Sequence, residues 1–227
     1  MKPKALIALV VLGALALPQA ASARVIELGS TIPTAKISCP DTCTALTRVT
    51  GYVGRGVSAR NPFLIPRAGK IVAFTVRLGS PNTEQLAFFE DRFGDTPQVQ
   101  LSILRQGTRR TNRRTHRLLA QSPAVRVRNY FGSAPTFVLD RPLDVARRNI
   151  VALTVPTWAP VLTVGLGRDT WWRSSRRRNC SNVDQQSAQT KRLTVRVFGC
   201  NYFRERPYYT VTYVPDPRPT RRTSSSN

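Results

Sequence analysis

Apolar and polar residues alternate with a period of two along most of this chain. In residues 71–78, every second position is apolar, from Val72 to Leu78, so these side chains are expected to share one face. Residues 150–155 are apolar on both faces, which is typical of a central strand. The same alternation recurs in residues 98–103, 125–128, 137–139, 192–197 and 208–213. Short strands separated by Gly, Pro and Asn predict an all-β fold, and we expect a jelly-roll-like antiparallel β-sandwich over residues 47–214.

Residues 81–93 break this period and predict one short helix. Ser80 is a favourable cap residue, and Pro81 suits the first helical position. Gly94 can supply a left-handed stop after the last turn. Apolar residues recur at helical spacing, at Leu86, Phe89 and Phe93. We expect this helix to close one end of the sandwich, with its aromatic side chains in the core.

The first 23 residues have the pattern of a secretory signal peptide. Lys2 and Lys4 precede an apolar run over residues 5–17, and Ala21-Ser22-Ala23 fits the small-x-small cleavage pattern. The run is shorter than the ~20 apolar residues of a spanning helix. We therefore expect cleavage after Ala23 rather than a permanent anchor, and a protein that is secreted or held in the cell envelope.

Two further segments flank the predicted sandwich. Residues 24–46 are mixed in character and are expected to form an extended lead-in. Residues 215–227 contain three prolines, three arginines and a run of serines. This composition is typical of a flexible basic tail.

The chain contains four cysteines, at positions 39, 43, 180 and 200. An even number in an exported chain indicates two disulfides, although four cysteines allow three connectivities. We favour Cys39 with Cys43, which closes a tight turn, and Cys180 with Cys200, which closes a polar segment. A zinc site is disfavoured because the spacing lacks paired C-x2-C knuckles and the surroundings are basic. We expect no metal site and no cofactor.

Charge narrows the class of partner. Lys and Arg number 35 against 12 Asp and Glu, giving a formal net charge of +23. One arginine cluster occupies the connection between two predicted strands and includes Arg105, Arg109, Arg110, Arg113, Arg114 and Arg117, with His116 among them. A second surrounds Trp171-Trp172 and includes Arg168, Arg173, Arg176, Arg177 and Arg178. Guanidinium groups pair bidentately with phosphate or carboxylate, so the partner is expected to be anionic.

The leading hypothesis is therefore a non-enzymatic binding protein that engages an anionic polymer or polysaccharide through these clusters. An anionic membrane surface is a second partner of the same charge, whereas intracellular nucleic acid does not suit an exported chain. An alternative is a neutral-carbohydrate module that uses Trp158, Trp171 and Trp172 as stacking platforms. A simpler interpretation of both clusters is a solvated loop and packed tryptophans. A purely structural envelope protein also stays open.

Catalytic motifs are absent from the sequence. There is no G-x-S-x-G elbow, phosphate-binding loop, dinucleotide fingerprint or H-E-x-x-H. His116 is the single histidine, and neighbouring positive charge is expected to lower its pKa. A carbohydrate-active hydrolase needs two facing carboxylates, and the candidates are Glu90, Asp91, Asp95, Asp140, Asp144 and Asp169. Each is more simply a cap, a turn residue or an arginine partner, so binding is favoured over catalysis.

Several segments carry a resemblance to a group of proteins. They are Ile71-Val-Ala-Phe-Thr-Val-Arg-Leu78, Gln100-Leu-Ser-Ile-Leu-Arg105, Leu119-Ala-Gln-Ser122, Phe137-Val-Leu-Asp-Arg-Pro-Leu-Asp-Val145 and Asn149-Ile-Val-Ala-Leu153. In strand pattern, residues 70–155 resemble secreted jelly-roll-like β-sandwich proteins of high-GC bacteria that have no assigned function. Those proteins often have Gly-Asp where this chain has Arg148-Asn149. The resemblance implies the sandwich fold and carries over no catalytic or binding residue.

Overall fold

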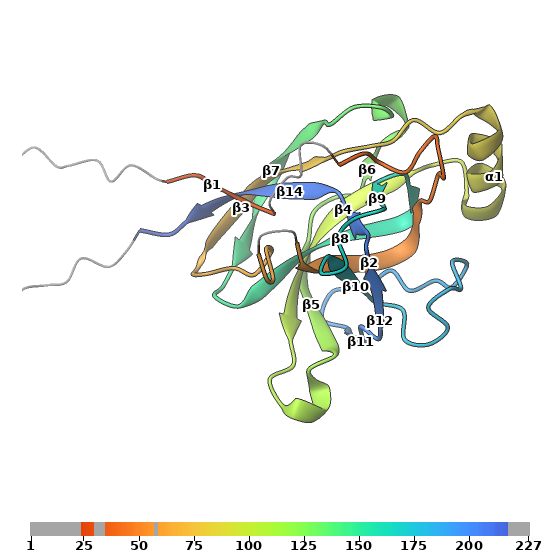
Figure 1. The fold of residues 1–227 in the computed structure, drawn as a ribbon. Helices are drawn as coiled ribbons and strands as arrows, with labels where there is room; N and C mark the ends of the chain where they lie inside the picture. Colours follow the sequence, from red (N-terminus) through yellow and green to blue (C-terminus); the bar gives the residue numbers. More distant parts are fainter. Residues whose placement is uncertain (1–23, 30–34, 57–58, 218–227) are drawn as a thin grey trace, which may run out of the picture.

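The computed structural model describes residues 24–29, 35–56 and 59–217. In this part of the chain, antiparallel strands form two main sheets, with one α-helix at one end (Figure 1). The predicted all-β sandwich with a single short helix is thus confirmed. The predicted signal peptide, with its cleavage site after Ala23, and residues 218–227 of the predicted tail lie outside the described residues.

The smaller sheet has four antiparallel strands in the order β1-β14-β3-β7. Their bounds are β1 Ile26–Leu28, β14 Tyr209–Pro215, β3 Gly69–Val76 and β7 Thr136–Val145. Strand β1 lies within the predicted lead-in, where it pairs with β14 from the other end of the chain. The described ends of the chain therefore lie at the same side of the molecule (Figure 1).

The larger sheet has eight strands, seven of them in the order β11-β5-β4-β8-β2-β10-β12, with β6 paired to β4. The bounds are β2 Leu46–Arg55, β4 Gln98–Gln106, β5 Thr115–Gln121, β6 Val125–Arg126, β8 Asn149–Ala159, β10 Trp171–Ser174, β11 Val195–Val197 and β12 Cys200–Phe203. A two-stranded ribbon joins β9 Leu162–Thr163 to β13 Arg206–Pro207, and short 3-10 turns occupy Arg110–Asn112 and Arg128–Tyr130. Strand β8 lies between β4 and β2, as its apolar sequence predicts.

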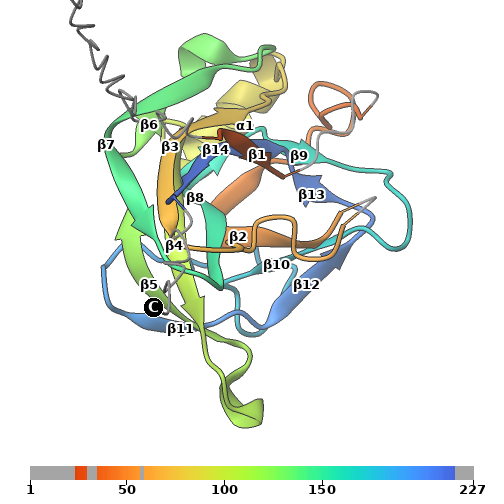
Figure 2. The same ribbon diagram turned by 90° about the vertical axis from the view of Figure 1, so that its left-hand side faces the viewer.

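The larger sheet curls into a half-barrel (Figure 2). Strands β11 and β12 stand at opposite ends of the strand order, yet only two residues separate them in sequence. The Phe198 amide donates to the carbonyl of Arg114 at 2.7 Å, beside β5, and the Cys200 amide donates to the carbonyl of Arg176 at 3.1 Å, beside β10. One short stretch of chain thus joins both margins of the sheet, which requires the curl.

The main core lies between the two sheets. Fully buried residues from the larger sheet include Leu101, Ile103, Val151 and Leu153. From the smaller sheet, Phe74, Val76, Tyr209, Val211 and Tyr213 pack against them. Burying a single such side chain contributes about 1.5–3 kcal/mol, so this layer is the main source of stability.

The other face of the larger sheet holds a smaller apolar cluster and several buried polar groups. Its apolar members are Tyr52, Leu104, Leu118, Ile150, Ala152 and Phe198. The irregular segment 175–194 lies against this face through hydrogen bonds. The Ser187 amide donates to the carbonyl of Arg48 at 2.8 Å, and the Gln189 amide donates to Thr50 Oγ1 at 2.9 Å.

Helix α1 spans Thr83–Phe93, two residues shorter at its start than predicted. The cap is Asn82 rather than Ser80, because the Asn82 side chain and Gln85 form a reciprocal capping box. Gly94 ends the helix at φ 98°, as expected of a glycine stop. Phe89 is buried and stacks on the indole of Trp158 with ring centroids 4.9 Å apart, which anchors the helix to the end of the sandwich.

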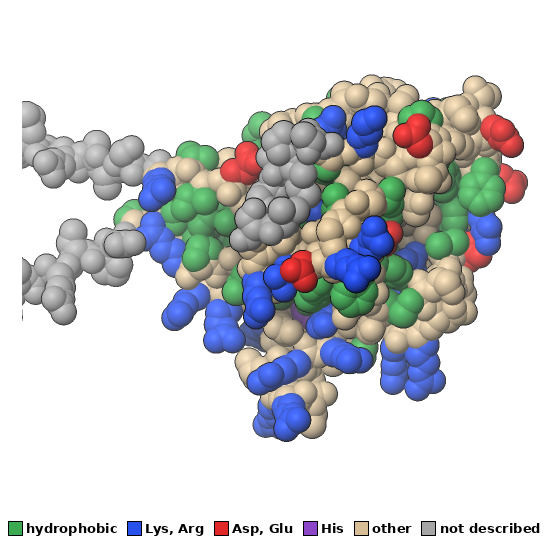
Figure 3. All heavy atoms as spheres, viewed as in Figure 1, with side chains coloured by type: hydrophobic (Ala, Val, Ile, Leu, Met, Phe, Trp, Pro, Cys, Tyr) green, Lys and Arg blue, Asp and Glu red, His purple; other side chains and the backbone are tan. Residues whose placement is uncertain are grey.

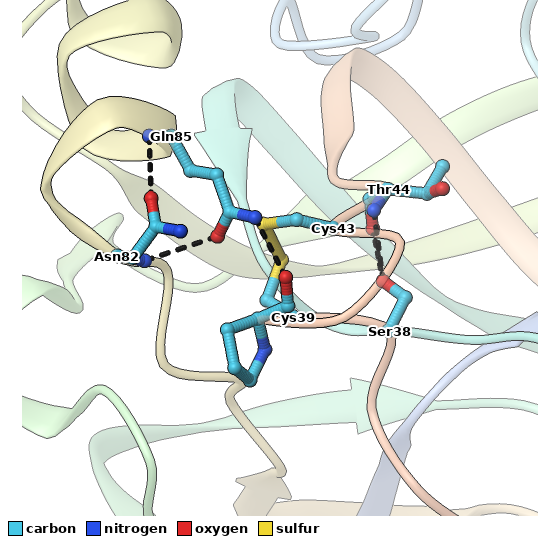
Figure 4. The surroundings of a disulfide bond; sticks show 7 residues. Ser38, Cys39, Cys43, Thr44, Asn82 and Gln85 are labelled. Carbon is cyan, nitrogen blue, oxygen red and sulfur yellow. Dashed lines mark hydrogen bonds between the residues drawn. A yellow bond between two sulfur atoms is a disulfide. The ribbon is translucent and has the colours of Figure 1, made fainter.

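Both favoured disulfides are present, Cys39 with Cys43 and Cys180 with Cys200. The first lies in a turn that is tied to the start of α1, because Gln85 Nε2 donates to the carbonyl of Pro40 at 2.6 Å (Figure 4). The second links segment 175–194 to β12. Two disulfides indicate an oxidising environment outside the cytoplasm.

Two strand predictions need correction. In β3, a register shift between Ile71 and Ala73 interrupts the alternation, so Ile71 is fully buried while Val72 is only half-buried. In the segment 192–197, only Val195–Val197 form a strand. Leu193 precedes the strand and Val195 lies in β11 at the margin of the sheet, and the two side chains are 58% and 52% exposed.

Candidate functional site

The β4–β5 hairpin projects beyond the sandwich and carries the first arginine cluster (Figures 1 and 2). Arg105 on β4 and Arg117 on β5 are direct cross-strand partners. Arg105 continues the face that holds Leu101 and Ile103, but at this end of the strand it is exposed. Like charges directly opposite each other destabilise a strand pair, so this arrangement is unfavourable unless an anion lies between them.

The hairpin loop has a defined conformation. The Gly107 amide donates to the carbonyl of Thr115 at 2.9 Å, and Gln106 Nε2 donates to the carbonyl of Arg113 at 2.6 Å. A side chain at position 107 would not fit, since a Cβ there would lie 2.4 Å from the carbonyl oxygen of Asn112. The loop backbone is therefore ordered by its own contacts, while its arginine side chains extend into solvent.

Loop residues Arg109, Arg110, Arg113 and Arg114 are all exposed. All twelve Asp and Glu side chains of the chain belong to described residues. Within the described part of the chain, four ion pairs form, and none involves the hairpin: Arg55–Asp169, Lys70–Asp144, Arg92–Asp184 and Arg128–Glu90. Figure 3 shows blue side chains on the projecting hairpin and no red side chain among them on this face. The hairpin charge is thus left without internal compensation.

The second arginine cluster divides into exposed and buried members. Arg177 and Arg178 are exposed, and Arg173 is half-buried. Arg176 is 4% exposed and donates from Nη2 to the carbonyl of Thr47 at 2.8 Å. The prediction that Arg176 binds an external anion is therefore wrong, because its guanidinium fixes β2 from inside the fold.

Two of the three predicted aromatic platforms are buried. Trp158 is fully buried under α1, and its indole Nε1 donates to the carbonyl of Gly94 at 2.9 Å. Trp172 is 1% exposed, stacks on Tyr202, and donates from Nε1 to the carboxylate of Glu205 at 3.0 Å. Neither ring has a free face for a sugar, so both predictions are corrected.

Trp171 is half-buried and lies on the opposite side of β10 from Trp172, as alternation in a strand requires. Its direct cross-strand partner on β12 is Phe203, which is 60% exposed. Phe203 is a candidate site residue that the sequence analysis misses. The signal was available in the alternation of Cys200 and Tyr202, which face inward, with positions 201 and 203.

His116 lies beneath the hairpin rather than among the exposed arginines. It is fully buried, and its Nε2 atom lies 3.1 Å from the hydroxyl of Tyr52. Burial is the main cause that lowers the pKa of His116 to about 4, and the positive charge of Arg173 contributes less. The expected direction of the pKa shift is correct, but its main cause is desolvation.

The carboxylates do not form a catalytic pair at either of two surface hollows. One hollow of about 340 Å³ lies beside α1 and has Glu84 as its one acidic lining residue. The other, of about 330 Å³, is lined by Gly54, Arg55, Arg60, Asn61 and Trp171. Glu90, Asp144 and Asp169 are engaged in ion pairs. Among the described residues, no group of three His, Cys, Asp or Glu side chains could hold a metal ion.

A scan against protein-family models and searches of curated proteins and solved structures found no match to this chain. The resemblance of residues 70–155 to secreted β-sandwich proteins therefore remains one of strand pattern. No helix within the described ranges is long and apolar enough to cross a membrane.

Proposed function

We propose that this protein is an exported, non-enzymatic binding protein that engages an anionic polymer of the cell envelope or the extracellular space. The ligand contacts the β4–β5 hairpin, where its phosphate, sulfate or carboxylate groups pair with Arg109, Arg110, Arg113 and Arg114. Export follows removal of residues 1–23 after Ala23, and the two disulfides suit the oxidising destination.

The observation that carries this proposal is the uncompensated charge of the hairpin. Six arginines occupy thirteen consecutive residues, from Arg105 to Arg117, and two of them face each other across the strand pair. None of them forms an ion pair with any of the twelve Asp and Glu side chains, all of which lie in the described part of the chain. A bound polyanion relieves this repulsion and releases its own counterions. Its affinity is therefore highest at low salt and falls as the salt concentration rises.

The test is retention of the mature protein on immobilised heparin, together with affinity measured at several salt concentrations. The variant Arg113→Gln/Arg114→Gln is expected to elute at lower salt than the parent protein. Removing one pairing of an arginine with an anionic group reduces the slope of log affinity against log salt by roughly one, so the slope falls by roughly two.

A matched control removes the same charge elsewhere. Arg126 and Arg141 are exposed and form no ion pair within the described ranges, and Arg126 lies at the end of the sheet opposite the hairpin. The variant Arg126→Gln/Arg141→Gln is expected to keep the parent slope. Elution of the parent protein at very low salt, or equal shifts in both variants, contradicts the proposal.

A further inference from the structure

A second surface combines a half-buried and an exposed aromatic ring with an arginine on the strands β10 and β12. Trp171 faces Phe203 across the strand pair, and Arg173 faces Asn201 two pairs further along. Side chains of Trp171 and Arg173 share one face, because they are two residues apart in a strand. The guanidinium of Arg173 lies 5.4 Å from the centroid of the Trp171 ring, and its Nε donates to Asn201 Oδ1 at 2.8 Å.

Trp171 also forms one wall of the hollow of about 330 Å³. The indole of Trp171 lies directly over Gly54. A Cβ at position 54 would stand 2.0 Å from a ring carbon, so only glycine leaves room for the ring in this position. Asn61 and Arg55 also line the hollow, and the Arg55 guanidinium lies 3.0 Å from the carboxylate of Asp169. A hollow of this volume is at the small end of ligand sites and suits a single ring-sized group.

The chemistry of this surface differs from that of the hairpin. The hairpin offers charge without aromatic rings, and it suits any polyanion. Here an indole and a phenyl ring lie beside guanidinium and amide donors. Aromatic faces attract the apolar C–H face of a ring, while guanidinium forks pair with carboxylates.

We propose that this surface, defined by Trp171, Arg173 and Phe203, binds the uronic-acid units of an acidic polysaccharide. A sugar ring stacks on Trp171 or Phe203, its carboxylate pairs with Arg173, and its hydroxyl groups meet the amides of Asn61 and Asn201. The inference rests on the proposed function and narrows its ligand, because an acidic polysaccharide carries both sugar rings that can stack on aromatic side chains and carboxylates that can pair with guanidinium groups.

The test compares two polyanions of equal charge number, an oligogalacturonate and an inorganic polyphosphate. The variant Phe203→Ala is expected to weaken oligogalacturonate binding by about tenfold, the size of one stacking interaction, and to leave polyphosphate binding unchanged. Trp171→Ala is expected to act in the same way. Phe203 is 60% exposed, so its removal should not alter thermal unfolding. Phe88→Ala, which removes a 51% exposed ring on α1, is the control and should change neither affinity.

The outcomes separate the two proposals. If both polyanions bind with equal affinity through the hairpin and the aromatic variants change nothing, the uronate inference fails while the proposed function stands. If neither polyanion binds, both fail. A third probe, single-stranded oligothymidylate, overturns the inference if it binds more tightly than oligogalacturonate and depends on Phe203, because the platform would then serve bases.

Discussion

The two faces of the larger sheet are buried by different kinds of structure, and their chemistry differs accordingly. The face toward the smaller sheet is apolar throughout its core, with Leu101 and Leu153 directly paired across β4 and β8. The opposite face mixes a small apolar cluster with buried Thr50, Thr154 and His116. Both faces belong to the same strands, so the difference reflects what covers each one.

The backbone groups of a covering sheet form hydrogen bonds with one another. Such a sheet therefore needs no polar side chains on the face of the larger sheet that it covers. The irregular segment 175–194 has no such ladder. Side chains of the larger sheet supply the missing partners: Thr50 Oγ1 accepts from the Gln189 amide at 2.9 Å, Thr47 Oγ1 donates to the Val183 carbonyl at 2.8 Å, and Gln121 Nε2 donates to the Gln189 carbonyl at 2.8 Å. Buried polar residues here follow from an irregular cover rather than from a catalytic need.

The largest effect is expected on the apolar face. Leu153→Ala removes a fully buried side chain from the core between the two sheets and leaves a cavity there. The free energy of unfolding, measured by urea denaturation, should fall by about 4 kcal/mol. Val138→Ala, at a residue that is 78% exposed, should change it little. Equal losses would mean that this layer is not the main core.

The buried His116 on the polar face of the larger sheet should make the free energy of unfolding depend on pH. The pKa of His116 is lowered from 6.5 to about 4 in the folded protein, so the unfolded chain binds the extra proton between these values. Stability due to this group is complete above pH 6.5 and is lost as the pH falls toward 4. The loss amounts to roughly 3 kcal/mol. The groups facing the ring are the Tyr52 hydroxyl, the Arg114 carbonyl and the charge of Arg173.

The control for the pH experiment is His116→Gln, which keeps hydrogen-bonding capacity and removes the titration. Glu205, whose pKa is raised by burial, and Asp184, whose pKa is lowered mainly by its hydrogen bond to Arg92, titrate in both proteins. The difference between the two pH profiles therefore isolates His116. Parallel profiles between pH 4 and 6.5 would show that the imidazole is accessible to water in the folded state.

Much of the fold could be predicted from local pattern. Alternation located the strands, the doubly apolar sequence of β8 placed it centrally, and the spacing of Phe89 and Phe93 located the helix. The failures arise where non-local contacts decide. The register shift in β3 reverses which of Ile71 and Val72 faces the core, and no local signal marks it. Asn82 competes with Ser80 as a cap, and the reciprocal bond to Gln85 decides the outcome.

The candidate site was less predictable than the fold. The exposed hairpin arginines follow from a charge run between two strands. The solvent exposure of each tryptophan depends on what packs against it. Helix α1 covers Trp158 and Tyr202 covers Trp172, whereas Trp171 is only half-buried. Arg176 is buried because its guanidinium donates a hydrogen bond to the backbone carbonyl of Thr47 in β2. Such pairings join residues far apart in sequence, so composition and spacing do not reveal them.

The smallest effect compares a threonine pair on the buried polar face with one on the surface. Thr50 and Thr154 share a hydrogen bond of 2.8 Å inside the half-barrel, whereas Thr75 and Thr136 share one of 2.7 Å on the exposed face of the smaller sheet. Thr50→Val leaves the Gln189 amide buried without its acceptor, so the free energy of unfolding should fall by about 2 kcal/mol. Thr75→Val leaves the Thr136 hydroxyl free to bond to water, so the free energy of unfolding should fall by less than about 0.5 kcal/mol. Urea denaturation of both variants measures the contrast, and faster amide exchange near Gln189 should accompany Thr50→Val alone. Equal costs would mean that segment 175–194 does not shield this face from water.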